Sequence, residues 1–263
     1  MNAYEYMRVG ENEKPLDRMV FDGGLCSIFR RIACIGDSLS SGELESVNED
    51  GTKGYHDFYE YSWGQQIARS TGATVYNFSA GGMTADRFHT FAHANGFWRT
   101  EKLCQAYIIA LGVNDLLNRG DEVGSVADID REHPENNAKT FVGEYAKIIQ
   151  RIQKLQPRAK IFLVSIPRYC ETRARKEELK LAHRNALQSL TEYFENTYLI
   201  DLYEYAPVFD EAFVDNYIFG HMTPAGYVFM GRMIESYIDY IIRKNPKDFA
   251  WVGFIGTDLY YHK

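Results

Sequence analysis

Five short and almost uninterrupted apolar runs recur along the chain, separated by longer amphipathic stretches. They cover residues 31–35, 73–78, 106–111, 160–166 and 198–202. Strands that are apolar along their whole length are typical of a parallel sheet covered on both faces. This alternation constrains the fold more than any other feature of the sequence, and we expect a five-stranded parallel sheet.

The stretches between these runs have the period of amphipathic helices. They cover residues 62–70, 84–105, 141–155, 177–195 and 224–242. In the third stretch Phe141, Tyr145, Ile148 and Ile152 share one helical face, and the pattern stops before Pro157. Strands that alternate with helices predict an α/β fold with helices on both faces of the sheet. In such folds the ligand site lies beyond the carboxyl ends of the strands.

The charge balance excludes some classes of partner. The 263 residues include 29 basic and 36 acidic side chains, which gives a net charge of −7. An acidic surface repels phosphate backbones, so we expect no nucleic-acid partner. The sequence has no apolar run of about eighteen residues, so no membrane span is expected. The polar N-terminal residues lack the apolar centre of a signal peptide, and we therefore expect a cytoplasmic protein.

The cysteines and the known ligand motifs indicate neither a metal nor a cofactor. Cys26, Cys34, Cys104 and Cys170 are widely spaced and form no CxxC pair, so a disulfide framework or a zinc site is not expected. The sequence also lacks a P-loop lysine motif, G-x-G-x-x-G and HExxH. We expect a protein without a cofactor or metal, and the sequence leaves its oligomeric state open.

Four short motifs follow the predicted strands or open a late helix. They are Gly36-Asp37-Ser38-Leu39-Ser40, residues 77–84 with Gly81-Gly82, Gly112-Val113-Asn114-Asp115, and His221-Met222-Thr223-Pro224. Each motif alone has an ordinary structural explanation, because serine caps helices while glycine and asparagine occupy turns. Their occurrence together, in this order and at strand ends, indicates one site.

This ordered set resembles the four sequence blocks of the SGNH hydrolases, also called GDSL esterases and lipases. Ser38, Gly82, Asn114 and His221 match the four residues that name the family. The resemblance implies a three-layer α/β/α, flavodoxin-like sandwich that hydrolyses esters through an acyl-enzyme. Because all four blocks belong to one sheet, we expect a single domain over residues 1–263.

The resemblance also implies a role for each matched residue. Ser38 would be the nucleophile and His221 the general base that takes its proton. The backbone N–H groups of Ser38 and Gly82 and the side-chain amide of Asn114 would form the oxyanion hole. Asp37 and Asp115 are expected to hold the loops of Ser38 and Asn114 in place.

The sequence departs from the family at the acid of the triad. In most members an Asp lies three residues before the histidine, and here that position is Ile218. Three groups remain as candidates to orient His221: Asp215, Asp210, or a backbone carbonyl near Ile218. The last of these leaves a Ser–His dyad, which we favour over Asp215, and the loss of a buried carboxylate predicts a slow enzyme.

Within a core over about residues 31–242, the loop at residues 116–140 is long, polar and acidic. It is either a solvated insertion or a loop that shapes access to the site. Its polarity disfavours a lipase activated at a membrane surface.

We therefore expect a serine esterase that acts on a small-molecule ester with a small acyl group, such as an acetyl group on carbohydrate. The alternative is an inactive SGNH scaffold that binds carbohydrate or another ligand. A His221 ring that reaches Ser38 and is itself held by an acceptor would favour catalysis.

Overall fold

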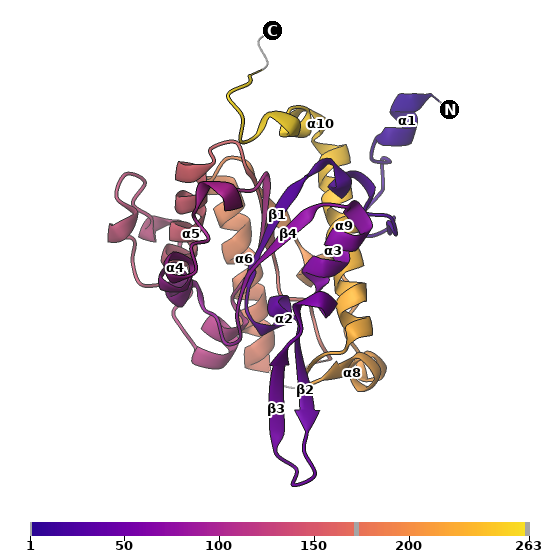
Figure 1. Cartoon of the computed structure of the whole chain (residues 1–263), viewed down its shortest axis with the longest axis vertical. Coiled ribbons are helices and arrows are strands. Elements are labelled where there is room, and N and C mark those ends of the chain that lie inside the picture. The colour runs from indigo at the N-terminus through magenta and orange to yellow at the C-terminus, as the bar shows by residue number, and fades with distance from the viewer. Residues whose placement is uncertain (1, 171–173, 261–263) are drawn as a thin grey trace.

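The centre of the protein is a parallel sheet, seen edge-on among the helices in Figure 1. The computed structural model describes residues 2–170 and 174–260. The strands are β1 (Arg31–Gly36), β4 (Thr74–Ser79), β5 (Ala106–Ala110), β6 (Lys160–Val164) and β7 (Thr197–Ile200). They lie in the order β4-β1-β5-β6-β7, and each neighbouring pair is parallel. This is the strand order of flavodoxin-like folds, so the predicted sheet is confirmed.

Helices cover both faces of the sheet (Figure 1). One face carries α3 (Trp63–Thr71) and α9 (Pro224–Lys244), and the other carries α4 (Ala85–Ala94), α5 (Phe141–Leu155) and α6 (Ala174–Tyr193). Successive residues of β1 serve opposite faces, because strand side chains alternate. Ile32 and Cys34 pack with α3 and α9, whereas Ala33 and Ile35 pack with α4 and α5. The three-layer sandwich is therefore confirmed.

The remaining short helices lie at the ends of these layers. They are α1 (Ala3–Met7), α7 (Leu202–Tyr205) and α10 (Pro246–Phe249). α1 and α10 lie at one end of the molecule, away from the carboxyl ends of the strands (Figure 1). In the described ranges no helix combines the length and the apolar character needed to cross a bilayer.

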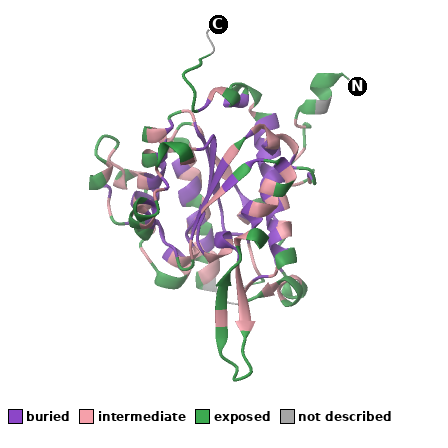
Figure 2. Ribbon diagram, viewed as in Figure 1, coloured by how far each residue is buried: buried purple, intermediate pink, exposed green. Residues whose placement is uncertain are grey.

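A β-hairpin that the sequence analysis did not anticipate projects beyond the carboxyl ends of the strands. After β1 the chain forms the single turn of α2 (Ser38–Ser41) and then pairs β2 (Glu43–Val47) with β3 (Lys53–Asp57) in antiparallel fashion. The hairpin extends from the body at the bottom of Figure 1, and Figure 2 shows it as exposed or half-buried along its length.

The base of this hairpin meets a second small pair of strands from late in the chain. α8 (Glu211–Tyr217) leads into β8 (Ile218–Phe219) and β9 (His221–Met222), which pair with each other. β2 contacts β9. Segments that lie far apart in the sequence therefore meet where the sheet's strands end.

The loop at residues 116–140 covers helices rather than the carboxyl edge of the sheet. It begins in a π-helical turn (Val113–Arg119), continues through short turns, and packs against α5 and α6. Its apolar residues Val123 and Ile129 lie against the core on the α5 side. The Thr140 hydroxyl donates to Asp128 within the loop. Most of the loop is therefore an insertion that covers α5.

Candidate active site

Ser38 lies at the first residue of α2, directly after β1 ends. The Asp37 carboxylate caps this turn by accepting the Leu39 N–H at 3.0 Å. A side chain at Gly36 would collide with Ser40, because its Cβ would lie 2.0 Å from the Ser40 Oγ. The tight turn that presents Ser38 therefore depends on Gly36 and on the Asp37 cap.

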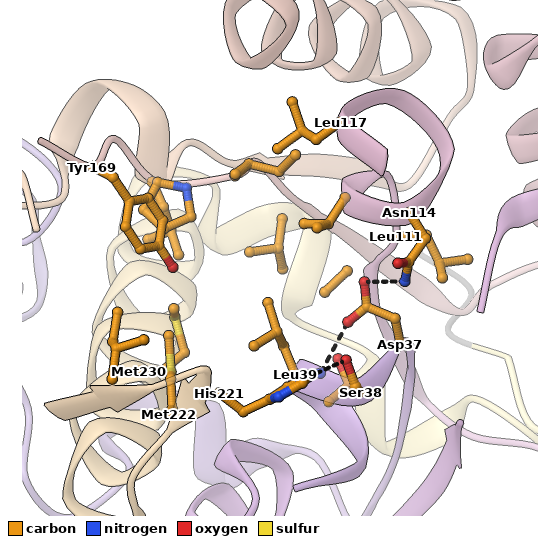
Figure 3. A pocket seen from close by; sticks show the side chains of 18 of the residues that line it. Asp37, Ser38, Leu39, Leu111, Asn114, Leu117, Tyr169, His221, Met222 and Met230 are labelled. Atoms are coloured by element: carbon orange, nitrogen blue, oxygen red, sulfur yellow. Dashed lines mark hydrogen bonds between the residues drawn. The ribbon is translucent and has the colours of Figure 1, made fainter. Parts of the chain in front are cut away.

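His221 lies on β9 and contacts Ser38 directly. Its Nε2 is 2.9 Å from the Ser38 Oγ, as the dashed line in Figure 3 shows. Its Nδ1 is 2.9 Å from Oε1 of Glu45. A carboxylate only accepts, so Nδ1 donates to Glu45, and Nε2 faces the Ser38 hydroxyl. The structure brings together the two residues expected to be nucleophile and base.

Glu45 comes from β2 of the hairpin, and sequence analysis did not identify it. Its side chain is 5% exposed and pairs with Lys53 across the hairpin at 2.8 Å. The Lys53 ammonium, with a further contribution from His221, lowers the pKa of Glu45. Gly220 makes room for this carboxylate, because a Cβ there would lie 1.8 Å from the Glu45 Oε1. Glu45 is therefore held ionised against His221.

The acids suggested by the sequence do not contact this ring. Asp215 lies exposed on α8. Asp210 caps the same helix and accepts the Phe213 N–H at 2.9 Å. Nδ1 faces the Glu45 carboxylate, so the structure shows neither Asp215 nor a backbone carbonyl near Ile218 in the orienting position.

A second carboxylate of the same strand also reaches His221. Oε1 of Glu43 lies 3.2 Å from Nε2, and the Glu43 side chain is 13% exposed. Burial raises the pKa of Glu43. The negative charges of Asp57 and Glu45 raise this pKa further, whereas His221 lowers it. Because side chains of a strand alternate, Glu43 and Glu45 lie on the same face of β2.

The residues expected in the oxyanion hole lie around the same cavity as Ser38. Gly82 has a φ of +65°, which favours glycine, and a Cβ there would meet no atom within 4 Å. The Asn114 amide donates to Oδ2 of Asp37 at 3.3 Å and to the Met83 carbonyl at 3.2 Å. Ser38, Gly82 and Asn114 all line the cavity.

Asp37 and Asp115 hold these loops, as the sequence predicted. Oδ1 of Asp115 accepts the Ala85 N–H at 2.8 Å and so ties the Asn114 turn to the start of α4. Burial raises the pKa of Asp37 to about 7 and that of Asp115 to about 6. Both carboxyls thus act as buried supports for the loops that carry Ser38 and Asn114.

The cavity has a volume of about 670 Å³ and a largely apolar wall opposite His221 (Figure 3). Leu117 and Tyr169 form part of the wall across from Ser38 and His221, and Met222 and Met230 lie below Tyr169 in the figure. Two residues of the loop at 116–140 line the cavity, Leu117 and Asn118. The start of this insertion is therefore part of the site. The described residues contain no group of three or more His, Cys, Asp or Glu suited to a metal ion.

Comparison with known proteins places the chain among proteins of this fold. It matches the model of the GDSL-like Lipase/Acylhydrolase family over residues 34–229. A family two carbohydrate esterase from Clostridium thermocellum, solved with cellohexaose, is similar with a TM-score of 0.58 and 16% identity, over 88% of this chain and 66% of that one. Among curated proteins none matches the chain.

Two further solved structures are similar over nearly their whole length. A carbohydrate acetylesterase from Sinorhizobium meliloti has a TM-score of 0.56 at 15% identity, over 81% of this chain and 99% of that one. A possible lipase from Chitinophaga pinensis has a TM-score of 0.51 at 18% identity, over 81% and 97%. At such low identities these likenesses establish the fold alone. The family match spans most of the chain and includes all four motifs, so the chain belongs to the GDSL-like lipase and acylhydrolase family of carboxylic ester hydrolases.

Proposed function

We propose that this protein is a serine esterase whose nucleophile, base and orienting acid are Ser38, His221 and Glu45. The observation that carries the proposal is the continuous contact from the Ser38 Oγ to Nε2 of His221 and from Nδ1 to Glu45. A nucleophile in contact with a base that is itself held by a third group is the arrangement that acyl transfer requires.

The first half of the reaction forms an acyl-enzyme. The Ser38 Oγ attacks the ester carbonyl while Nε2 of His221 takes its proton. Glu45 keeps the ring in the reactive tautomer and stabilises the imidazolium that forms. As the tetrahedral intermediate collapses, Nε2 gives the proton to the departing alcohol. In the second half Nε2 takes a proton from a water molecule whose oxygen attacks the acyl carbonyl. The bond to the Ser38 Oγ then breaks, Nε2 returns the proton to that oxygen, and the acid leaves.

The developing oxyanion is stabilised by the backbone N–H groups of Ser38 and Gly82 and by the Asn114 amide. The two bonds that the amide makes in the free protein are long, at 3.2 and 3.3 Å. Long hydrogen bonds are weak, so the amide loses little when it turns to a full negative charge. A charge-assisted bond in the transition state favours that turn.

The apolar wall of the cavity supports a site where the acyl group lies against Leu117 and Tyr169. The alcohol half then lies on the opposite side, toward the hairpin, because its oxygen receives the proton of Nε2. We propose small acyl esters as substrates, with acetylated carbohydrate among them. The similarity to solved carbohydrate esterases supports this class.

An inactive binding scaffold would be expected to have a His221 turned away from Ser38, or a site filled by side chains. His221 instead contacts Ser38, and the cavity beside them is open. Both observations support catalysis over binding alone.

Hydrolysis of p-nitrophenyl acetate tests the proposal. The wild-type chain should release p-nitrophenol with repeated turnover, and Ser38→Ala and His221→Ala should each remove that activity. Among the described residues His221 is the hydrogen-bond partner of the Ser38 hydroxyl, so Ser38→Ala should keep the melting temperature of the wild type. A wild-type chain that fails on a broad panel of esters contradicts the proposed function.

A further inference from the structure

Glu43 is a charged group in the site that the mechanism above does not use. It lines the cavity beside Ser38, and its backbone carbonyl accepts the hydroxyl of the buried Tyr227 at 2.9 Å. Its carboxylate lies between His221 and Gly81, where a Cβ on Gly81 would come within 2.8 Å of Oε2. The Glu43 carboxylate therefore lies between His221 and the loop that carries Gly82.

The two carboxylates of β2 differ in how fully they are satisfied. Glu45 is bound by both Lys53 and Nδ1 of His221. Of the described side chains, His221 is the one that reaches the Glu43 carboxylate, and it does so through the nitrogen it shares with Ser38. A carboxylate has about four acceptor sites, so most of those on Glu43 remain for another donor. Partial burial makes it costly to leave them without one.

The position of Glu43 identifies that donor as part of the substrate. In the second step of acyl-enzyme formation Nε2 protonates the leaving oxygen, which places the alcohol beside the group that lies 3.2 Å from Nε2. Burial raises the pKa of Glu43, and a carboxylate of higher proton affinity is a stronger hydrogen-bond acceptor. With the leaving oxygen at Nε2, a hydroxyl on the carbon next to the ester-bearing carbon would come within reach of the Glu43 carboxylate.

We propose that Glu43 binds a second hydroxyl of the alcohol half of the substrate, on the carbon next to the one that carries the ester oxygen. Glu43 thereby makes the enzyme selective for esters of vicinal diols and polyols over esters of simple alcohols. The inference rests on the proposed esterase function and adds to it the class of leaving group.

A neighbouring aromatic residue agrees with a hydroxyl-rich leaving group. Tyr55, opposite Glu45 in the hairpin, packs edge-on against His221 at 6.2 Å between centroids and is 58% exposed. It offers an apolar face to the carbon side of a polyol.

The test compares two acetate esters, glycerol 1-acetate and ethyl acetate, by titrating the acetic acid released. The readout is the ratio of their kcat/KM values, so a general loss of activity cancels. In the wild type the glycerol ester should be preferred, and Glu43→Gln should reduce the preference about tenfold or more, since a bond to a charged acceptor is lost. Glu43→Asp, which keeps the carboxylate but shortens it, should give an intermediate ratio.

Two other glutamates of the hairpin serve as matched controls. Glu45→Gln should lower kcat/KM for both esters together and keep their ratio. Glu49→Gln, in the exposed turn of the hairpin, should change neither value. Acetylcholine as a third ester tests the cationic alternative.

Distinct results overturn the inference and the proposed function. An active wild type whose ratio is unchanged by Glu43→Gln overturns the role of Glu43 and leaves the esterase proposal standing. A preference for acetylcholine that Glu43→Gln removes replaces the diol with a cation. A wild type that hydrolyses none of the three esters contradicts the proposed function and this inference with it.

Discussion

Oε1 of Glu45 lies 2.9 Å from Nδ1 of His221, although 176 residues separate them in the sequence. Glu45 lies on the hairpin strand directly after the Ser38 turn, so one short segment carries both side chains that contact the His221 ring nitrogens at 2.9 Å. The position usually occupied by the family's acid is Ile218, and the hairpin supplies a carboxylate to the same ring from the other side.

Replacement of Glu45 should therefore impair catalysis without affecting the nucleophile itself. Glu45→Gln removes the negative charge that faces the imidazolium and allows the wrong tautomer of His221. We expect kcat on p-nitrophenyl acetate to fall by about 10²- to 10⁴-fold. Steady-state kinetics measure the loss.

Asp215→Asn is the matched control for that variant, since the sequence offers Asp215 as the acid. Asp215 is exposed on α8, and we expect its replacement to leave kcat within about twofold of the wild type. A larger loss from Asp215→Asn than from Glu45→Gln would contradict the assignment of Glu45.

Removal of the Asn114 amide should slow the chemical step. Asn114→Ala deletes one of the three proposed oxyanion donors, and loss of one such donor lowers kcat by about 10²- to 10³-fold. KM should change little, because the bond forms fully only in the transition state. A melting temperature measured in parallel shows whether the lost contact with Asp37 destabilises the fold. A rise in KM with an unchanged kcat would argue against an oxyanion role.

The apolar wall should set the length of the acyl chain that the enzyme accepts. Leu117 is half-buried and lines the cavity, and the larger side chain of Leu117→Trp would fill part of the cavity volume. We expect kcat/KM for p-nitrophenyl hexanoate to fall about tenfold relative to that for the acetate. Equal losses on both esters would place the acyl group elsewhere.

Stability should depend on pH through Glu235, which lies fully buried on α9. Burial raises its pKa from 4.5 to about 7. The folded chain keeps this proton while the unfolded chain loses it, so the free energy of unfolding falls as pH rises from 4.5 to about 7. Glu235→Gln cannot titrate and should show a smaller drop in melting temperature between about pH 5 and about pH 8. Identical drops in the variant and the wild type would contradict this origin.

The sheet and its helices could be predicted because their information is local. Each strand is an apolar run, and α5 is observed at Phe141–Leu155, the residues that its pattern and Pro157 predicted. The contact between Ser38 and His221 also followed, because the resemblance joins two motifs that lie far apart. The resemblance gives no such guide at Ile218, where the chain departs from the family.

The contact between Glu45 and His221 could not be predicted, because it depends on how two unrelated segments meet. The alternation Glu43-Leu44-Glu45-Ser46-Val47 before a turn ending in Gly51 signals a hairpin with both glutamates on one face. Nothing local indicates that β2 meets β9. Asp215 looked suitable in the sequence, but Asp210 caps α8, and on that helix Asp215 is exposed.

The position of the loop at residues 116–140 could not be predicted either, because it too depends on contacts between distant segments. Its acidic composition was compatible with a surface insertion or with a loop at the site. Two apolar residues, Val123 and Ile129, pack it on the α5 side, and only its start reaches the cavity. A composition averaged over the segment hides such anchors.

Covalent labelling with diethyl p-nitrophenyl phosphate tests the central claim most directly, because the reagent phosphorylates an activated serine and releases p-nitrophenol. We predict one diethylphosphoryl group per chain, located on Ser38 by peptide mass analysis, at a rate that Glu45→Gln slows and Asp215→Asn leaves unchanged. Labelling of another residue, or labelling of Ser38 at the same rate in the Glu45→Gln variant, would contradict a nucleophile activated through His221 by Glu45.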